Sequence, residues 1–365
     1  MAPLWFVFLR KIVRICKLQQ ITSIADFISS RYGKNLSLGY LVTIFCLIGI
    51  IPYIALQLKA ISDSFNIITS SVPEVDSFFG FIDFTAVWVM IGLALFTILF
   101  GARKPETTEQ HGGLMVAVAF ESVVKLVVFL IAGVCLIYWG WESPAATPSN
   151  ASQWQQVNQL PAGADWVGLL ILSGFAATFL PRQFQVNVVE TSQENNLKHS
   201  SWVFPLYLLL INLMVIPIAY MGMQVLGKTN APSDYLLLTL PLHYHANWLA
   251  VLVYIGGISA SSSMVMVEAT ALSTMFSNNL VIPFLARQAS KKQEFSNLGS
   301  RTLLIRRSGI VLILFLAYLY YETIGHYSTL VSIGFISFVS ILQFVPSIIG
   351  GIYWQWGNKY GVLSG

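Results

Sequence analysis

Three ionisable residues lie inside apolar segments long enough to cross a membrane, where a charge is costly. Glu121 and Lys125 share the segment 113–141 at positions i and i+4, with the acid first. This order and spacing favour an ion pair on one helix face, so a structural pair is a better interpretation than a functional role. Glu268 lies in the segment 247–280, and a carboxyl group inside a span is a candidate proton carrier. Alternatively, Glu268 lies at the mouth of the span or pairs with a base elsewhere.

The other reactive residue types do not form patterns typical of catalysis or metal binding. His243 and His245 would supply two ligands, which are too few for a metal site. The widely spaced cysteines, Cys16, Cys46 and Cys135, lie in or beside apolar segments, as packing residues do. No Ser/His/Asp arrangement, paired carboxylates or phosphate-binding glycine loop is present. The sequence therefore predicts no enzyme, no catalytic residue, no metal, no cofactor and no ATP-driven pump.

The composition places these residues in a membrane protein. The chain has 365 residues, of which 56% are hydrophobic and only 10% charged. Soluble domains carry about a quarter charged residues, so an ordinary soluble protein and a disordered chain are both excluded. The formal net charge of +4 comes from Lys and Arg in loops. No basic face is present, so nucleic acid is not an expected partner.

Hydropathy predicts an all-α polytopic membrane protein with a single membrane domain and no soluble domain. Residues 1–9 are apolar but too few to span a bilayer, which indicates the stub of a span. Near the end of the first full span, Lys59 and Asp63 are expected to extend to the membrane surface. The predicted full spans are 36–68, 84–102, 113–141, 164–180, 203–226, 247–280, 308–325 and 329–353.

The basic residues predict the orientation of the chain. Seventeen of the 20 Lys and Arg lie in alternate connections, including six within 10–35. Cytoplasmic connections carry the excess of Lys and Arg, so these connections should face the cytoplasm. The opposite connections, 69–83 and 142–163, contain neither residue type. We therefore expect Gly365 on the cytoplasmic side of the membrane.

The two longest spans, 36–68 and 247–280, are five positions apart and run in opposite directions. Inverted five-helix repeats with a midplane binding site are typical of secondary transporters. The string ITSIADFISSRYGKN (21–35), the small-residue run within 247–280 and the segment 327–365 resemble the sodium:solute symporter family. With IPYIALQLKAIS (51–62) and LPRQFQVNVVE (180–190), the chain looks closest to the symporter-like membrane region of bacterial sensor histidine kinases.

The resemblance implies a fold and a set of site residues. The fold would be the inverted-repeat symporter fold, truncated at its N-terminus, because the family's first core helix would lie before Met1. The family's cation site would fall on the backbone carbonyl of Ala260 and on Ser263 and Met264. Met264 departs from the pattern, since a thioether is a poor ligand for a hard cation. Unwinding near Ser173 and Gly174 would expose backbone groups to a solute.

The expected function is secondary active transport of a small polar solute, coupled to a gradient of Na⁺ or H⁺. The resemblance implies an amino acid as the solute, and the lipid bilayer is the other partner. One alternative is a solute-sensing input module of a sensor histidine kinase whose kinase region is missing from this chain. Another is an inactive fragment of either protein. The small residues from Gly256 to Ser263 are also explained by close helix packing alone.

Overall fold

The computed structural model describes residues 2–69, 84–102, 112–142, 163–191, 194–226, 233–286, 298–325, 328–354 and 356–364. Every regular element in these ranges is a helix, which confirms the all-α prediction. Seven of the described helices are long and apolar enough to cross a membrane, and one bent pair would make eight. The chain is an all-α polytopic membrane protein. Gly365 lies outside the described residues, so its side of the membrane stays a prediction.

Several long helices extend beyond the predicted apolar ranges. Polar and charged residues at their ends continue the helical hydrogen bonding of the backbone, and a hydropathy pattern does not detect these residues as part of the helix. The predicted stub 1–9 is the first half of α1, a single helix that also carries the basic residues after it. The helices with the candidate spans are α3 (Leu36–Thr69), α4 (Phe84–Gly101), α5 (Gly112–Glu142), α7 (Gly163–Phe179), α9 (Glu194–Leu226), α11 (Asn247–Met275), α13 (Leu298–Thr323) and α14 (Leu330–Leu342).

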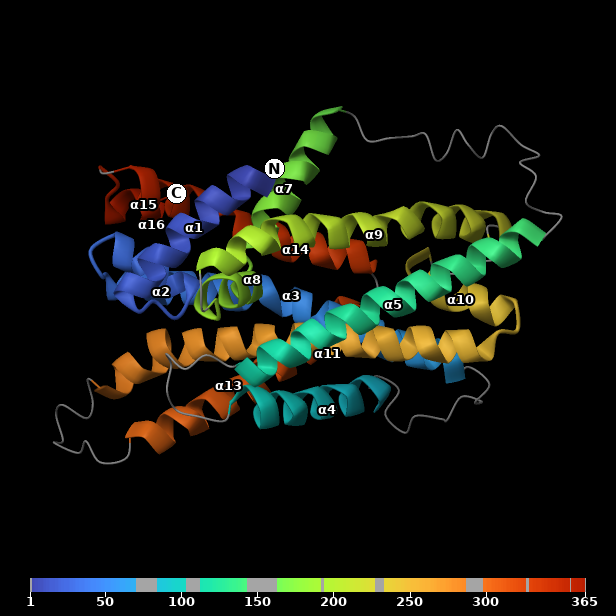
Figure 1. Cartoon of the computed structure of the whole chain (residues 1–365). Coiled ribbons are helices and arrows are strands. Elements are labelled where there is room, and N and C mark those ends of the chain that lie inside the picture. The colour runs from blue at the N-terminus through green and yellow to red at the C-terminus, as the bar shows by residue number, and fades with distance from the viewer. Residues whose placement is uncertain are drawn as a thin grey trace.

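Shorter elements lie between and beyond these helices. The π-helical segment η4 (Phe276–Val281) continues α11, and α15 (Val345–Tyr353) continues the last span after a short break. Figure 1 shows α1 (Ala2–Gln19), α2 (Ile24–Arg31), α15 and α16 (Lys359–Ser364) gathered at one end of the bundle. At the opposite end, α10 (Leu236–His243) follows the short helix η3 (Ser233–Tyr235).

Helix α3 is the centre of the bundle. It packs against α2, α4, α11, α13 and α14. In the most apolar 18-residue stretch of α3, 61% of the residues are buried, compared with 6% in the corresponding stretches of α5 and α9. One of its closest approaches is at Gly49, where an added Cβ would lie 2.6 Å from Cβ of Ser340 on α14. Because α3 is buried on most sides, it needs apolar residues around its whole circumference, whereas the apolar residues of α5 and α9 are mostly exposed on the outside of the bundle, where lipid would surround them.

The predicted span 164–180 is part of a broken helix. Helix α7 ends at Phe179, and α8 (Pro181–Phe184) with the π-helical segment η2 (Gln185–Val189) follows at an angle of 51°. Leu180 has φ −54° and ψ 137°, which is extended backbone. A proline disfavours helical backbone in the residue before it, so Pro181 explains the bend. The prediction that the helix unwinds near Gly174 is therefore wrong, because α7 is continuous through that residue.

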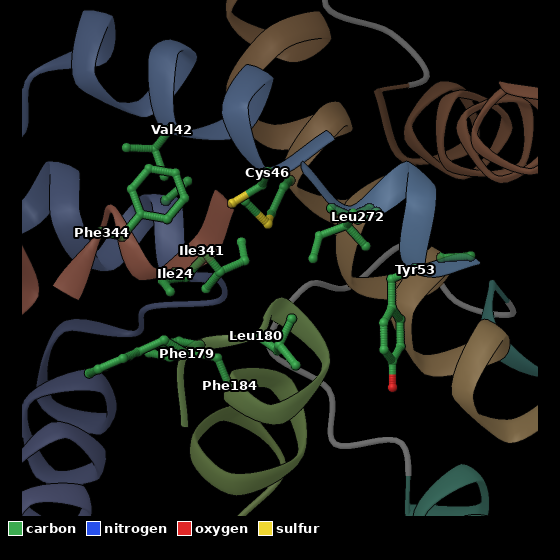
Figure 2. Packing of buried hydrophobic residues seen from close by; sticks show 14 of the residues in the cluster. Ile24, Val42, Cys46, Tyr53, Phe179, Leu180, Phe184, Leu272, Ile341 and Phe344 are labelled. Atoms are coloured by element: carbon green, nitrogen blue, oxygen red, sulfur yellow. The ribbon is translucent and has the colours of Figure 1, made fainter. Parts of the chain in front are cut away.

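The bend at α8 lies against the main apolar cluster. Figure 2 shows Phe179, Leu180 and Phe184 below side chains such as Cys46 of α3 and Leu272 of α11. The same cluster includes Ile24 of α2, and Ile341 of α14 and Phe344 just beyond it. Tyr53 stands at the edge of this cluster, and its hydroxyl points away from the apolar side chains (Figure 2). Packing at this point fixes α8 relative to α3 and α11.

Candidate functional site: a cavity between α3, α5, α11 and α14

Two adjoining cavities open between four of the long helices. The larger has a volume of about 470 Å³ and the smaller about 220 Å³. They share five lining residues: Lys125, Gly257, Ala260, Ser261 and Leu330. The larger volume falls within the range of roughly 300–1,000 Å³ that is usual for small-molecule sites.

Helix α11 leaves room for the cavities because one of its faces carries small residues. Gly257, Ala260 and Ser261 are spaced as i, i+3 and i+4, so they lie together on one face. No atom lies within 4 Å of a Cβ built on Gly257, whereas one built on Gly256 would contact Val128 of α5. The small-residue run thus has two uses, helix packing at Gly256 and open space at Gly257.

The wall opposite α11 is apolar and aromatic. In the larger cavity it is formed by α3 and by one face of α14. Polar atoms on the α3 side come from Tyr53 and Gln57, whose side chains are otherwise buried. The lining residues of α14, which begins at Leu330, are Leu330, Val331, Gly334, Phe335 and Phe338.

Among the residues that the structure describes, Lys125 is the one charged side chain that lines the larger cavity, and it lines the smaller one too. Within the described part of the chain, its ammonium has neither a hydrogen-bond nor an ion-pair partner. The predicted ion pair with Glu121 is not formed in this structure: Glu121 lies beside Ser263 instead, and its buried Oε2 has no partner among the residues that are described. The i, i+4 spacing therefore did not reveal the neighbours of either residue.

The three predicted cation ligands do not face one space. Ala260 and Met264 line the larger cavity, but Ser263 does not. The Ser263 hydroxyl donates to the carbonyl oxygen of Ala260 at 3.1 Å, within the same helix. The sulfur of Met264 accepts a hydrogen bond from the Tyr53 hydroxyl at 3.7 Å. The cation role of these residues stays a prediction.

Glu268 lies farther along α11 and is completely buried. Neither of its carboxylate oxygens has a hydrogen-bond partner among the described residues. The positive charge that acts on it belongs to Arg182 of α8, which packs against α11. The Arg182 guanidinium lies over the ring of Tyr53, with 5.7 Å between its carbon and the ring centroid. Glu268 and Arg182 are thus linked to the cavity through Tyr53.

Ser173 and Gly174, the predicted substrate-binding residues, are exposed and line neither cavity. The Ser173 hydroxyl donates to the carbonyl oxygen of Leu169 at 2.6 Å, as serine often does inside a helix. The break that brings α8 toward the cavity comes at Leu180 and Pro181. Pro181 directly precedes Arg182, so this proline was the sequence feature that could have pointed to the position of Arg182 after a helix break. A solute role for Ser173 and Gly174 stays a prediction.

At the α10 end of the cavities, hydrogen bonds join three elements. The Tyr235 hydroxyl donates to Asp63 at 2.7 Å, and Asp234 accepts from the backbone N–H of Leu330 at 2.9 Å.

Lys59, predicted to reach the membrane surface, is instead buried. Its ammonium donates to the carbonyl oxygens of Gly325 and Ser328 at 2.6 and 2.7 Å. These carbonyl groups satisfy the charge inside the protein, so the predicted extension of Lys59 is wrong.

Comparison with known proteins gives two distant relatives, while no family model matches the chain. It is 23% identical to a Bacillus subtilis protein named as an uncharacterized symporter, YodF, over 99% of this chain and 68% of the relative. It is 22% identical to a protein of Rhizobium johnstonii named as a monocarboxylate transport permease, over 93% of this chain and 64% of the relative. The chain therefore spans about two thirds of the length of these relatives. One is named as a symporter and the other as a transport permease, and the similarity supports solute transport in general.

Proposed function

We propose that the chain is part of a secondary transporter that moves a small solute through the cavity between α3, α5, α11 and α14. The observation that carries this proposal is the ammonium of Lys125, which has no partner among the described residues and faces a space of about 470 Å³ within a bundle of membrane helices. A charged group inside a membrane span indicates a solute or ion pathway. Near-full-length similarity to two proteins named as transporters supports it.

A cation gradient drives the transport in this proposal, and the proton is the favoured cation. Besides the oxygen atoms of Tyr53, Gln57 and Ser261, the cavity presents the thioether of Met264 and the ammonium of Lys125, and these two groups do not suit a sodium ion. Glu268 is a buried carboxyl group without a hydrogen-bond partner in the described part of the chain, as a proton carrier inside a span would be. The bacterial cytoplasmic membrane is the proposed location, with the basic residues of 10–35 on its inner side.

Two solute classes are in competition. The sequence resemblance implies an amino acid, while one relative is named as a monocarboxylate permease. The sensory alternative, an input module for a histidine kinase, rests on sequence resemblance alone. It would use the same cavity for binding but would not need to move the solute across the membrane.

Flux measurements in liposomes test the proposal. The purified protein is reconstituted, and uptake of labelled propionate, L-alanine and glucose is followed under an imposed proton gradient with choline in place of sodium. We expect one of them to accumulate above the level in empty liposomes, and Glu268→Gln to abolish the accumulation. Met264→Thr, which supplies a hydroxyl, should make uptake more sensitive to sodium. Uptake equal to that of empty liposomes under both proton and sodium gradients would exclude transport.

A further inference from the structure

We propose that Lys125 binds the carboxylate group of the solute, and that the solute is a small monocarboxylate rather than an amino acid or a sugar. This inference rests on the proposed function, because it names the substrate class of the same cavity. The resemblance to symporters leaves the solute open, so the argument depends on the groups that face the cavity.

The first step concerns charge. Lys125 lines both cavities, and the described residues offer its ammonium no carboxylate and no hydrogen-bond acceptor. A second positive charge, that of Arg182, acts on Lys125 from α8. A partly buried ammonium without an acceptor is costly, and an anionic ligand removes this cost by forming a charge-assisted hydrogen bond. The cavity therefore favours a ligand with a single negative charge.

The second step excludes a zwitterion. An amino acid would need an anionic partner for its own ammonium group, and no Asp or Glu among the described residues lines the larger cavity. Asp234 lines only the smaller cavity, where it accepts from the backbone N–H of Leu330, and Glu121 lines neither cavity. Glu268 lines neither cavity and interacts electrostatically with Arg182. A buried ammonium without a partner would oppose binding, so L-alanine should bind more weakly than propionate, from which it differs by its amino group.

The third step concerns the rest of the ligand. Away from Lys125, one side of the larger cavity is walled by Leu56 and by Val331, Phe335 and Phe338 of α14, while its polar groups come from Tyr53, Gln57 and Ser261. The apolar side chains offer no hydrogen bonds to the hydroxyl groups of a sugar that would face them, and those hydroxyl groups would lose their bonds to water. They suit a short alkyl group, whose transfer from water is favourable. A carboxylate at one end and a small apolar body at the other is the ligand that matches both regions.

Binding of a matched ligand series tests the inference. Propionate, its uncharged analogue propionamide and L-alanine are compared by equilibrium binding and by thermal stabilisation of the purified protein. Propionate should bind, and the other two should bind at least about 30-fold more weakly, as expected when a buried charge pair lacks one partner. Lys125→Met should weaken propionate binding by a similar factor, and Lys125→Arg should retain most of it.

Arg301→Gln is the matched control, because it removes an exposed positive charge at the start of α13 and should leave binding unchanged. Three outcomes would overturn the inference: no binding of propionate to the folded protein, equal binding of propionate and alanine, or unchanged propionate binding by Lys125→Met. If Lys125→Met does not fold, the ligand series on the unmutated protein still decides.

The two proposals can fail separately. Propionate binding that depends on Lys125, without accumulation in liposomes under any gradient, would support the assignment of Lys125 and contradict transport. Accumulation of alanine or glucose that is insensitive to Lys125→Met would contradict the assignment of Lys125 and support transport.

Discussion

The guanidinium carbon of Arg182 lies over the ring of Tyr53, 5.7 Å from its centroid, and Tyr53 is one of the residues that line the larger cavity. The same arginine also interacts electrostatically with the buried carboxylate of Glu268. A helix break thus places a positive charge where a carboxylate of α11 would otherwise be isolated. This arrangement gives the first prediction.

Arg182→Gln alone should destabilise the protein, because it leaves the charge of Glu268 buried without an opposite charge. The expected loss is about 3 kcal/mol, and the double variant Arg182→Gln with Glu268→Gln should recover a large part of it. Thermal unfolding of the single and double variants in detergent measures the coupling. Losses that simply add would show that the two residues have separate partners.

Tyr235→Phe should lower the free energy of unfolding by about 1 kcal/mol, because it removes the hydrogen bond from the Tyr235 hydroxyl to Asp63. Burial, and then the hydrogen bond to Asp63, raise the pKa of Tyr235 above its ordinary value. A raised pKa means that the folded state holds the proton more tightly than the unfolded state does.

The contribution of Tyr235 is therefore complete below about pH 10, the ordinary pKa of tyrosine, and is lost as the pH rises above it. Unfolding measured from pH 7 to 11 should show an alkaline decline in the unmutated protein and a smaller decline in Tyr235→Phe. Identical pH profiles for the two proteins would contradict this prediction.

Glu121→Gln and Lys125→Met should have nearly additive effects on stability, with a coupling below about 0.5 kcal/mol. The reason is that Glu121 lies beside Ser263 and forms no ion pair with Lys125. A double-mutant cycle on thermal unfolding checks this. If the double variant recovered the folded yield that a single variant loses, the two residues would form the ion pair that the helical spacing suggests, and this prediction would be wrong.

Gly49→Ala should destabilise the protein by about 1–3 kcal/mol, because its Cβ would lie 2.6 Å from Cβ of Ser340 and force α3 and α14 apart. Gly92→Ala is the matched control, since Gly92 is inside α4 and has no atom within 4 Å of its Cβ position. That substitution should stabilise the helix by about 0.5–1 kcal/mol. A melting temperature for Gly49→Ala that equals or exceeds that of the control would contradict the close approach.

The sequence was sufficient for the helical, polytopic architecture, because hydropathy sums over whole spans and tolerates errors at single residues. The predicted position of Glu268 inside a span also agrees with its complete burial. Neighbours across helices were not accessible in this way. The spacing of Glu121 and Lys125 offered only a partner on the same helix, whereas their surroundings come from α11 and the cavity. Gly174 suggested unwinding, but the restriction that Pro181 places on Leu180 decided where the helix bends.

Lys59 and Gly49 attach α14 to α3 at two levels. The ammonium of Lys59 binds the carbonyl groups of Gly325 and Ser328, just before α14 begins, and the backbone at Gly49 touches Ser340 near its other end. The stretch of α14 between these anchors carries Phe335 and Phe338, which face the cavity. These two attachments hold this part of α14 close to α3. We therefore expect α3 and α14 to act as a size filter, so that affinity falls abruptly once the alkyl chain of a carboxylate becomes longer than the distance from Lys125 to these rings.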